Sequence, residues 1–129
     1  MVNYRSLIGK QWSYGSNDCF SLLREYYSLL GIVLPDFPRP ESLERTESIF
    51  LKHARDIGFA RVEFDDRAEH DVIIMRLGTA APMHAAIYVG NDKILHQRMN
   101  SVSAVESLRR YYRERTAAVF RHATCHAGR

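Results

Sequence analysis

Apolar residues change their spacing at Gly58, and this change limits the fold more than any other feature of the sequence. Before Gly58, residues 18–30 and 41–57 carry apolar side chains at the spacing of one helix face. After Gly58, five runs have the period of two that is typical of strands. These runs cover residues 59–64, 71–77, 84–89, 93–99 and 117–123. Helices followed by a series of strands predict an α+β fold with an antiparallel sheet.

Shorter signals separate these elements. The three prolines in residues 32–40 predict an ordered loop rather than a helix or an inner strand. Residues 90–92, Gly-Asn-Asp, have the composition of a hairpin turn. Residues 105–115 are expected to form a short helix or turn. Its inward-facing side chains would be Leu108, Tyr111 and Tyr112.

Length and composition exclude several classes of protein. The 129 residues, of which 46% are hydrophobic, fit one domain over residues 1–129 with a packed core. The net charge of +3 is mild, and it accompanies no recognition motif, so no nucleic-acid partner is expected. No run approaches the roughly 18 apolar residues of a membrane span. Residues 1–11 lack the apolar core of a secretory signal, so the protein is expected to be made in the cytoplasm.

Cys19 lies where a predicted helix begins. Asn17 and Asp18 are good helix-capping residues, so Cys19 falls in the first turn. The free N–H groups and the macrodipole at a helix start favour a thiolate, which is the nucleophilic form of cysteine. The alternative is that Cys19 is a small buried hydrophobe, as many free cysteines are.

Two histidines complete a possible catalytic set. His84 opens one predicted strand, and His96 lies on the strand expected to pair with it. Together with Cys19 they would supply a nucleophile, a base and a group that orients the base. Each histidine taken alone is equally compatible with a structural role. The other histidines are expected to lie on the surface: His53, His70, His122 and His126.

The hairpin decides whether the two histidines meet. Side chains alternate along a strand, so a plain two-residue turn at residues 91–92 would place His96 on the face opposite to His84. A three-residue loop at residues 90–92 would make the two residues diagonal neighbours on one face, with Ala86 opposite His96. We therefore predict an odd-length loop or an equivalent bulge, with the His84 ring between Cys19 and His96.

The order of these features resembles the NlpC family of papain-like cysteine peptidases. The resemblance rests on Asp18-Cys19 at a helix start, the strand at residues 71–75 and the segment 84–96. Residues 18–27 and 31–39 are similar to the branch of the family found in bacteriophage tail assembly proteins. The resemblance implies a papain-like fold in which N-terminal helices pack on a five- to six-stranded antiparallel sheet.

The resemblance also implies a reaction. Members hydrolyse the stem peptides of bacterial peptidoglycan, often at the D-γ-glutamyl–diaminopimelate bond, without a cofactor or metal. By position Cys19 matches the nucleophile, His84 the base and His96 the orienting residue. The substrate-binding or oxyanion positions would be Trp12, Tyr14 and Asp18. Trp12 replaces the usual tyrosine, and His70 stands where a glycine usually precedes Asp71.

The expected partners are a peptidoglycan stem peptide and other phage tail proteins, with the protein in the host cytoplasm during assembly and then in the virion tail. Two alternatives remain open. One is a catalytically silent tail component with the same fold. The other is a small zinc protein that uses Cys19, His84, His96 and perhaps Cys125, although no short Cys-x-Cys or His-x-His spacing is present.

Overall fold

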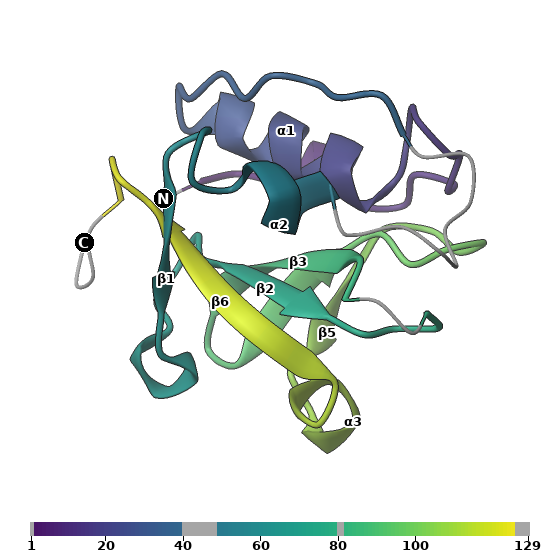
Figure 1. Cartoon of the computed structure of the whole chain (residues 1–129). Helices are drawn as coiled ribbons and strands as arrows, with labels where there is room; N and C mark the ends of the chain where they lie inside the picture. Colours follow the sequence, from purple (N-terminus) through teal and green to yellow (C-terminus); the bar gives the residue numbers. More distant parts are fainter. Residues whose placement is uncertain (1, 40–48, 80–81, 126–129) are drawn as a thin grey trace.

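The computed structural model describes residues 2–39, 49–79 and 82–125, and Figure 1 shows helices lying over an antiparallel sheet. The helices are η1 (Arg5–Leu7), α1 (Cys19–Leu29), α2 (Ile49–His53), η2 (Phe64–Asp66) and α3 (Arg110–Arg113). The strands are β1 (Phe59–Val62), β2 (Val72–Met75), β3 (His84–Gly90), β4 (Lys93–His96), β5 (Ala104–Ser107) and β6 (Thr116–His122). All neighbours are antiparallel in the order β1-β6-β2-β3-β4-β5. The predicted α+β class and the six-stranded form of the sheet are confirmed.

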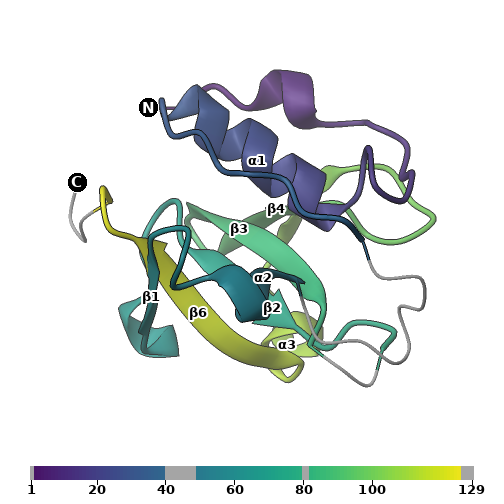
Figure 2. The ribbon, with the colours of Figure 1, turned by 45° about the horizontal axis from the view of Figure 1, so that its top comes forward.

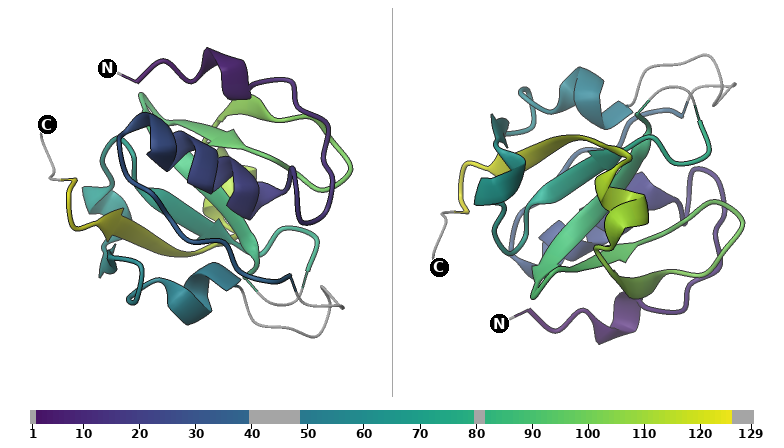
Figure 3. Two further views of the ribbon diagram at one scale, coloured as in Figure 1. Left: turned by 90° about the horizontal axis from the view of Figure 1, so that it is seen from above. Right: turned by 90° about the horizontal axis from the view of Figure 1, so that it is seen from below.

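The centre of the sheet is buried on both faces. In β2 all four side chains are buried, and they alternate between two hydrophobic clusters. Val72 and Ile74 pack with the residues of α1, whereas Ile73 and Met75 pack with Tyr112 of α3. The two views of Figure 3 show α1 crossing one face of the sheet and α3 lying on the other. A strand covered on both faces is apolar at every position, which explains the continuous apolar run in β2.

The ends of α1 follow from its sequence. The Asp18 side chain accepts the Ser21 N–H at 2.9 Å, so the helix begins at Cys19 as predicted. At the other end Gly31 adopts a positive φ of 80°, and its N–H donates to Ser28 while that of Ile32 donates to Tyr27. This Schellman arrangement ends the helix and reverses the chain. Figure 2 shows the following segment, up to residue 39, running back along α1.

The prediction for residues 105–115 was wrong in part. Residues 104–107 form β5, which pairs with β4, and only Arg110–Arg113 is helical. Leu108 and Tyr112 are buried as expected, but Tyr111 is 46% exposed. Successive residues of a helix point about 100° apart, so Tyr111 and Tyr112 cannot both face the core.

The second predicted helix is only partly covered by the structure. Residues 40–48 lie outside the described residues. From residue 49 onward the helix is shorter than expected, because α2 ends at His53 and turns lead to Gly58. Gly58 has a φ of 95°, and a Cβ there would lie 2.7 Å from Nε2 of His122. Both the backbone conformation and the close ring therefore require glycine at the turn into β1.

Candidate active site

The hairpin between β3 and β4 contains the bulge that the parity argument requires. Asn91 and Asp92 form a two-residue turn with φ of 53° and 54°. The register shifts between Tyr88 and Gly90, and Ala86 then lies opposite His96. The shift adds one residue to β3, which returns the two histidines to the same face. The prediction is confirmed in its second form, an equivalent bulge.

The two predicted histidines are in direct contact. Nε2 of His84 lies 2.9 Å from Nδ1 of His96, and their ring centroids are 5.0 Å apart. Both residues are buried, with exposed fractions of 7% for His84 and 1% for His96. The structure therefore brings together His84 and His96, which are two of the three proposed catalytic residues.

Glu106 extends this pair, and the sequence reasoning missed it. Its Oε2 lies 2.5 Å from Nε2 of His96, and the Tyr112 hydroxyl donates to the same oxygen at 2.9 Å. Arg98 and Arg109 also approach this carboxylate, at 3.4 and 3.3 Å. Glu106 lies on β5, in a segment predicted to be a short helix or turn, so its position beside β4 was not predicted. A strand assignment for residues 104–107 would have revealed it.

The carboxylate fixes where the protons of both rings lie. Burial alone would raise the pKa of Glu106, but the hydrogen bonds from His96 and Tyr112 lower it to about 2, so it is an acceptor. Nε2 of His96 must then carry a proton. Burial lowers the pKa of His96, so that ring is neutral and its Nδ1 accepts from Nε2 of His84. By this assignment Nδ1 of His84 keeps its lone pair.

His84 is therefore a neutral imidazole with one free basic nitrogen. Burial, with smaller contributions from the neighbouring His96 and Arg98, lowers its pKa to about 3. Among the described residues no hydrogen bond to Nδ1 of His84 is present. That nitrogen is the atom available to take a proton from a nucleophile.

The Cys19 thiol lies close to the start of β3, the strand that carries His84, and burial disfavours its ionisation. The thiol is half-buried and donates to the Met83 carbonyl at 3.6 Å, one residue before His84. Burial raises the pKa of Cys19 to about 11, and the N–H groups of Ala85 and Phe20 offset this only in part. The expected preference for thiolate at the helix start is thus wrong, because desolvation outweighs the helix terminus. That the His84 ring stands between Cys19 and His96 stays a prediction.

One cavity of about 580 Å³ is lined by most of the predicted site residues. Five of the six predicted site residues line it, and His96 lies behind His84. Those five residues are Trp12, Tyr14, Asp18, Cys19 and His84. The Trp12 and Tyr14 rings are stacked, with their centroids 6.1 Å apart, so they form one aromatic wall of the cavity. An oxyanion role for either ring stays a prediction.

Asp18 has a role that its sequence position only partly indicated. One carboxylate oxygen accepts from the N–H and hydroxyl of Ser21, and the other accepts from the Gly15 N–H. Arg39 binds both oxygens, at 2.7 and 3.1 Å. Asp18 is therefore a helix cap held in an ion pair, and a direct part in binding substrate stays a prediction.

Two of the histidines assigned to the surface have structural roles. His70 binds the Tyr26 hydroxyl through Nδ1 at 2.7 Å and has a φ of 83°. This conformation explains why glycine is usual at the position. His122 is 9% exposed and hydrogen-bonds Thr124 at 2.9 Å, so its assignment to the surface was wrong. His53 is partly buried and stacks on Phe37, and His126 lies outside the described residues.

Two other properties can be stated for the described part of the chain. It contains no helix long and apolar enough to cross a membrane. Nor do three or more of its His, Cys, Asp or Glu side chains gather in a way that would hold a metal ion. The zinc alternative therefore has no ligand cluster to support it in residues 2–39, 49–79 and 82–125.

Comparison with known proteins identifies the family. The sequence profile of the NlpC/P60 family matches residues 9–121, which include every predicted site residue. The chain belongs to the NlpC/P60 family. A curated protein of similar sequence is the tail tip assembly protein K of Escherichia phage lambda, which is 32% identical over 117 residues. The match covers 90% of this NlpC/P60 chain and 59% of the phage lambda protein.

Solved structures agree on the fold. A lipoprotein-like NLP/P60 protein of Staphylococcus aureus has a TM-score of 0.64 at 18% identity, covering 91% of this chain and 38% of its own. NlpC1 of Trichomonas vaginalis has a TM-score of 0.65 at 20% identity, with coverages of 92% and 41%. An NlpC/P60 protein of Bacillus cereus has a TM-score of 0.62 at 19% identity, with coverages of 92% and 37%. These likenesses confirm the NlpC fold predicted from the sequence.

Proposed function

We propose that this NlpC/P60 chain is a phage-tail cysteine peptidase that hydrolyses stem peptides of bacterial peptidoglycan, at bonds of the D-γ-glutamyl–diaminopimelate type. One observation carries the proposal: a thiol and a neutral imidazole line one cavity, and the imidazole is backed by a buried histidine that is bonded to a carboxylate. The membership of a peptidase family agrees with that arrangement.

The proposed reaction begins from neutral groups. Sγ of Cys19 attacks the amide carbon while its proton passes to Nδ1 of His84. The resulting imidazolium is stabilised because its Nε2–H is already bonded to His96, which is bonded in turn to Glu106. His84 then returns the proton to the leaving amine as the C–N bond breaks. Water, deprotonated by His84, cleaves the thioester and releases the acid and the free thiol.

The lining of the cavity fits an anionic peptide. Arg98 and Arg109 line one wall and share a single carboxylate, Glu106, so both retain donors that can bind a ligand. Asp18, which also lines the cavity, is neutralised by Arg39. Stem peptides carry free carboxylates, and arginine binds carboxylates through two parallel hydrogen bonds.

The tail location rests on the similarity to the phage lambda protein, whose name describes tail tip assembly. We infer that this chain is made in the host cytoplasm, joins other tail proteins and reaches the cell wall within the virion tail. Finding the protein in the periplasm of cells that express it alone would contradict this delivery.

A catalytically silent tail component is the second candidate. The observation that favours it is the pKa of Cys19, about 11, because very little thiolate is then present at neutral pH. Such a protein would keep the fold and use the surface from Trp12 to Cys19 for docking.

The decisive experiment is digestion of purified muropeptides, followed by mass spectrometry. The wild-type protein should cleave stem peptides, and Cys19→Ala should abolish cleavage while leaving the melting temperature nearly unchanged. Cys125→Ala is the matched control, and it should keep full activity because Cys125 packs against the core away from the cavity lining. Cleavage by Cys19→Ala, or none by the wild type, would refute the peptidase assignment.

A further inference from the structure

The segment after α1 is fixed against that helix by polar and aromatic contacts. Nε of Arg24 donates to the Leu34 carbonyl at 3.1 Å, and Leu34 is buried. The Phe37 ring lies between two others, 3.8 Å from His53 and 5.9 Å from Phe20. The prolines of this segment keep it extended, so it runs back along α1 and delivers Arg39 to the start of the helix.

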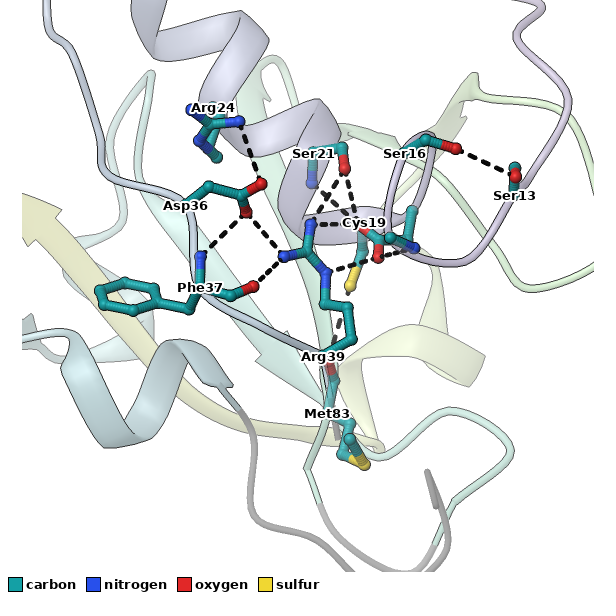
Figure 4. Close-up of polar contacts among 11 residues, drawn as sticks. Ser13, Ser16, Cys19, Ser21, Arg24, Asp36, Phe37, Arg39 and Met83 are labelled. Atoms are coloured by element: carbon teal, nitrogen blue, oxygen red, sulfur yellow. Dashed lines mark hydrogen bonds and ion pairs between the residues drawn. The ribbon is translucent and has the colours of Figure 1, made fainter. Parts of the chain in front are cut away.

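Arg39 is almost fully enclosed at that point. Its side chain is 8% exposed, and its guanidinium binds four groups. Nε and Nη2 contact the two oxygens of Asp18 at 2.7 and 3.1 Å, and Nη2 also donates to the Ser21 hydroxyl at 3.1 Å. Nη1 donates to Asp36 at 2.6 Å and to the Phe37 carbonyl at 2.5 Å. Figure 4 shows the guanidinium between Asp36 and the first turn of α1, close to Cys19.

The ion pair between Arg39 and Asp18 affects Cys19 because the Asp18 carboxylate is close to the thiol. Asp18 is the neighbour of Cys19 in sequence and caps its helix. A carboxylate there opposes ionisation of the thiol, whereas the Arg39 guanidinium favours it. The other titratable groups that line the cavity, among the described residues, are Tyr14, His84, Arg98, Arg109, Tyr111 and Tyr112. Burial raises the pKa of Tyr14 and lowers that of His84, so both are neutral near pH 8.

We propose that Arg39 is a positioning residue for Cys19, which fixes the capping carboxylate of α1 and cancels its charge so that the thiolate can form during attack. The proposal deepens the proposed function, since it says how a buried thiol next to an aspartate can act as a nucleophile. It makes a prediction of opposite sign for the two partners of the ion pair. Removing Arg39 leaves the Asp18 carboxylate beside the thiol without its cation, whereas neutralising Asp18 leaves Arg39 with Asp36 as its remaining ion-pair partner.

The test measures alkylation of Cys19 by iodoacetamide, which is small and neutral, in a Cys125→Ser background that leaves one thiol. Rates are measured from pH 7 to 9, below the pKa of the thiol, and the labelled peptide is identified by mass spectrometry. The variants are Arg39→Gln, Arg39→Lys, Asp18→Asn and the double variant of Arg39→Gln with Asp18→Asn. Asparagine still caps a helix, so the Asp18 variant removes the charge and keeps the cap.

The expected changes can be sized. A like charge nearby raises a pKa by about one unit or more. One unit lowers the thiolate fraction about tenfold, but the more basic thiolate is also more nucleophilic, with a Brønsted coefficient of about 0.4–0.5. Arg39→Gln should therefore slow alkylation roughly three- to fourfold, and Asp18→Asn should accelerate it by a similar factor. The double variant should return near the wild-type rate, and Arg39→Lys should recover part of the loss.

The double variant separates charge from structural damage. If Arg39→Gln acted only by loosening the fold, adding Asp18→Asn would not restore the rate, and this outcome would overturn the proposal. An unchanged or slower rate in Asp18→Asn alone would also overturn it, and that variant remains informative if Arg39→Gln does not fold. No substrate is needed, so the expected rates together with no muropeptide cleavage would refute the peptidase function and leave the role of Arg39 standing.

Discussion

The buried neutral His84 should make the protein lose stability in mild acid. Its pKa is about 3 in the folded state against an ordinary value of 6.5, because burial disfavours the imidazolium. In the unfolded chain the ring is free to bind a proton below pH 6.5, whereas the folded protein does not bind one until about pH 3. The contribution of the neutral His84 to the free energy of unfolding is therefore fully present above pH 6.5, and it is lost as the pH drops toward 3.

The size of the loss follows from the two pKa values. Integrating the linkage relation between pH 7.5 and pH 5 gives a decrease of about 2 kcal/mol in the free energy of unfolding from His84 alone. The lowered pKa values of His96 and His122 act in the same direction. Glu106 adds its own loss mainly below pH 4.5, at which its carboxyl in the unfolded chain is half protonated.

Urea denaturation at pH 7.5 and pH 5 provides the assay. His84→Gln removes the titrating group, so its loss of stability between the two pH values should be about 2 kcal/mol smaller than that of the wild type. Cys19→Ala is the control from the same cavity, and it should keep the wild-type loss because its thiol stays protonated throughout this range. Equal losses in the wild type and in His84→Gln would refute the assignment of His84 as a buried neutral base.

Four further predictions concern the catalytic chain and its surroundings. His84→Ala should lower kcat by about 10²–10⁴-fold, whereas His96→Gln, which can still accept a hydrogen bond, should cost less, and equal losses would contradict the division of roles. Glu106→Gln should lower kcat roughly tenfold through loss of a charged hydrogen bond, with a change in the ¹⁵N shifts of the His96 ring as the accompanying signature. Gly90→Ala should cost about 1–2 kcal/mol in urea denaturation, since Gly90 has a φ of 87°. Arg109→Gln should lower kcat/KM for stem peptides with free carboxylates and leave that for amidated peptides nearly unchanged, as judged by mass spectrometry of the digests.

Short stretches of the sequence determined much of the site, although the site residues are far apart along the chain. The capping carboxylate of Asp18 set the start of α1 and so the place of Cys19. Strand alternation, with a count of the residues between His84 and His96, predicted an odd-length loop or an equivalent bulge, and a bulge is present. These inferences succeeded because capping and strand parity depend on a few consecutive residues, whose geometry is nearly independent of the rest of the fold.

Tertiary structure decided what depends on neighbours distant in sequence. Glu106 became part of the histidine chain only when a four-residue strand, too short to be recognised from its pattern, paired with β4. The Cys19 thiol at the helix start was expected to be a thiolate, but burial against β3 raised its pKa instead. Arg39 reached Asp18 across 21 positions because the segment after α1 folds back along the helix. Burial and charge are sums over all surrounding groups, so they are fixed only when the chain has closed around the site.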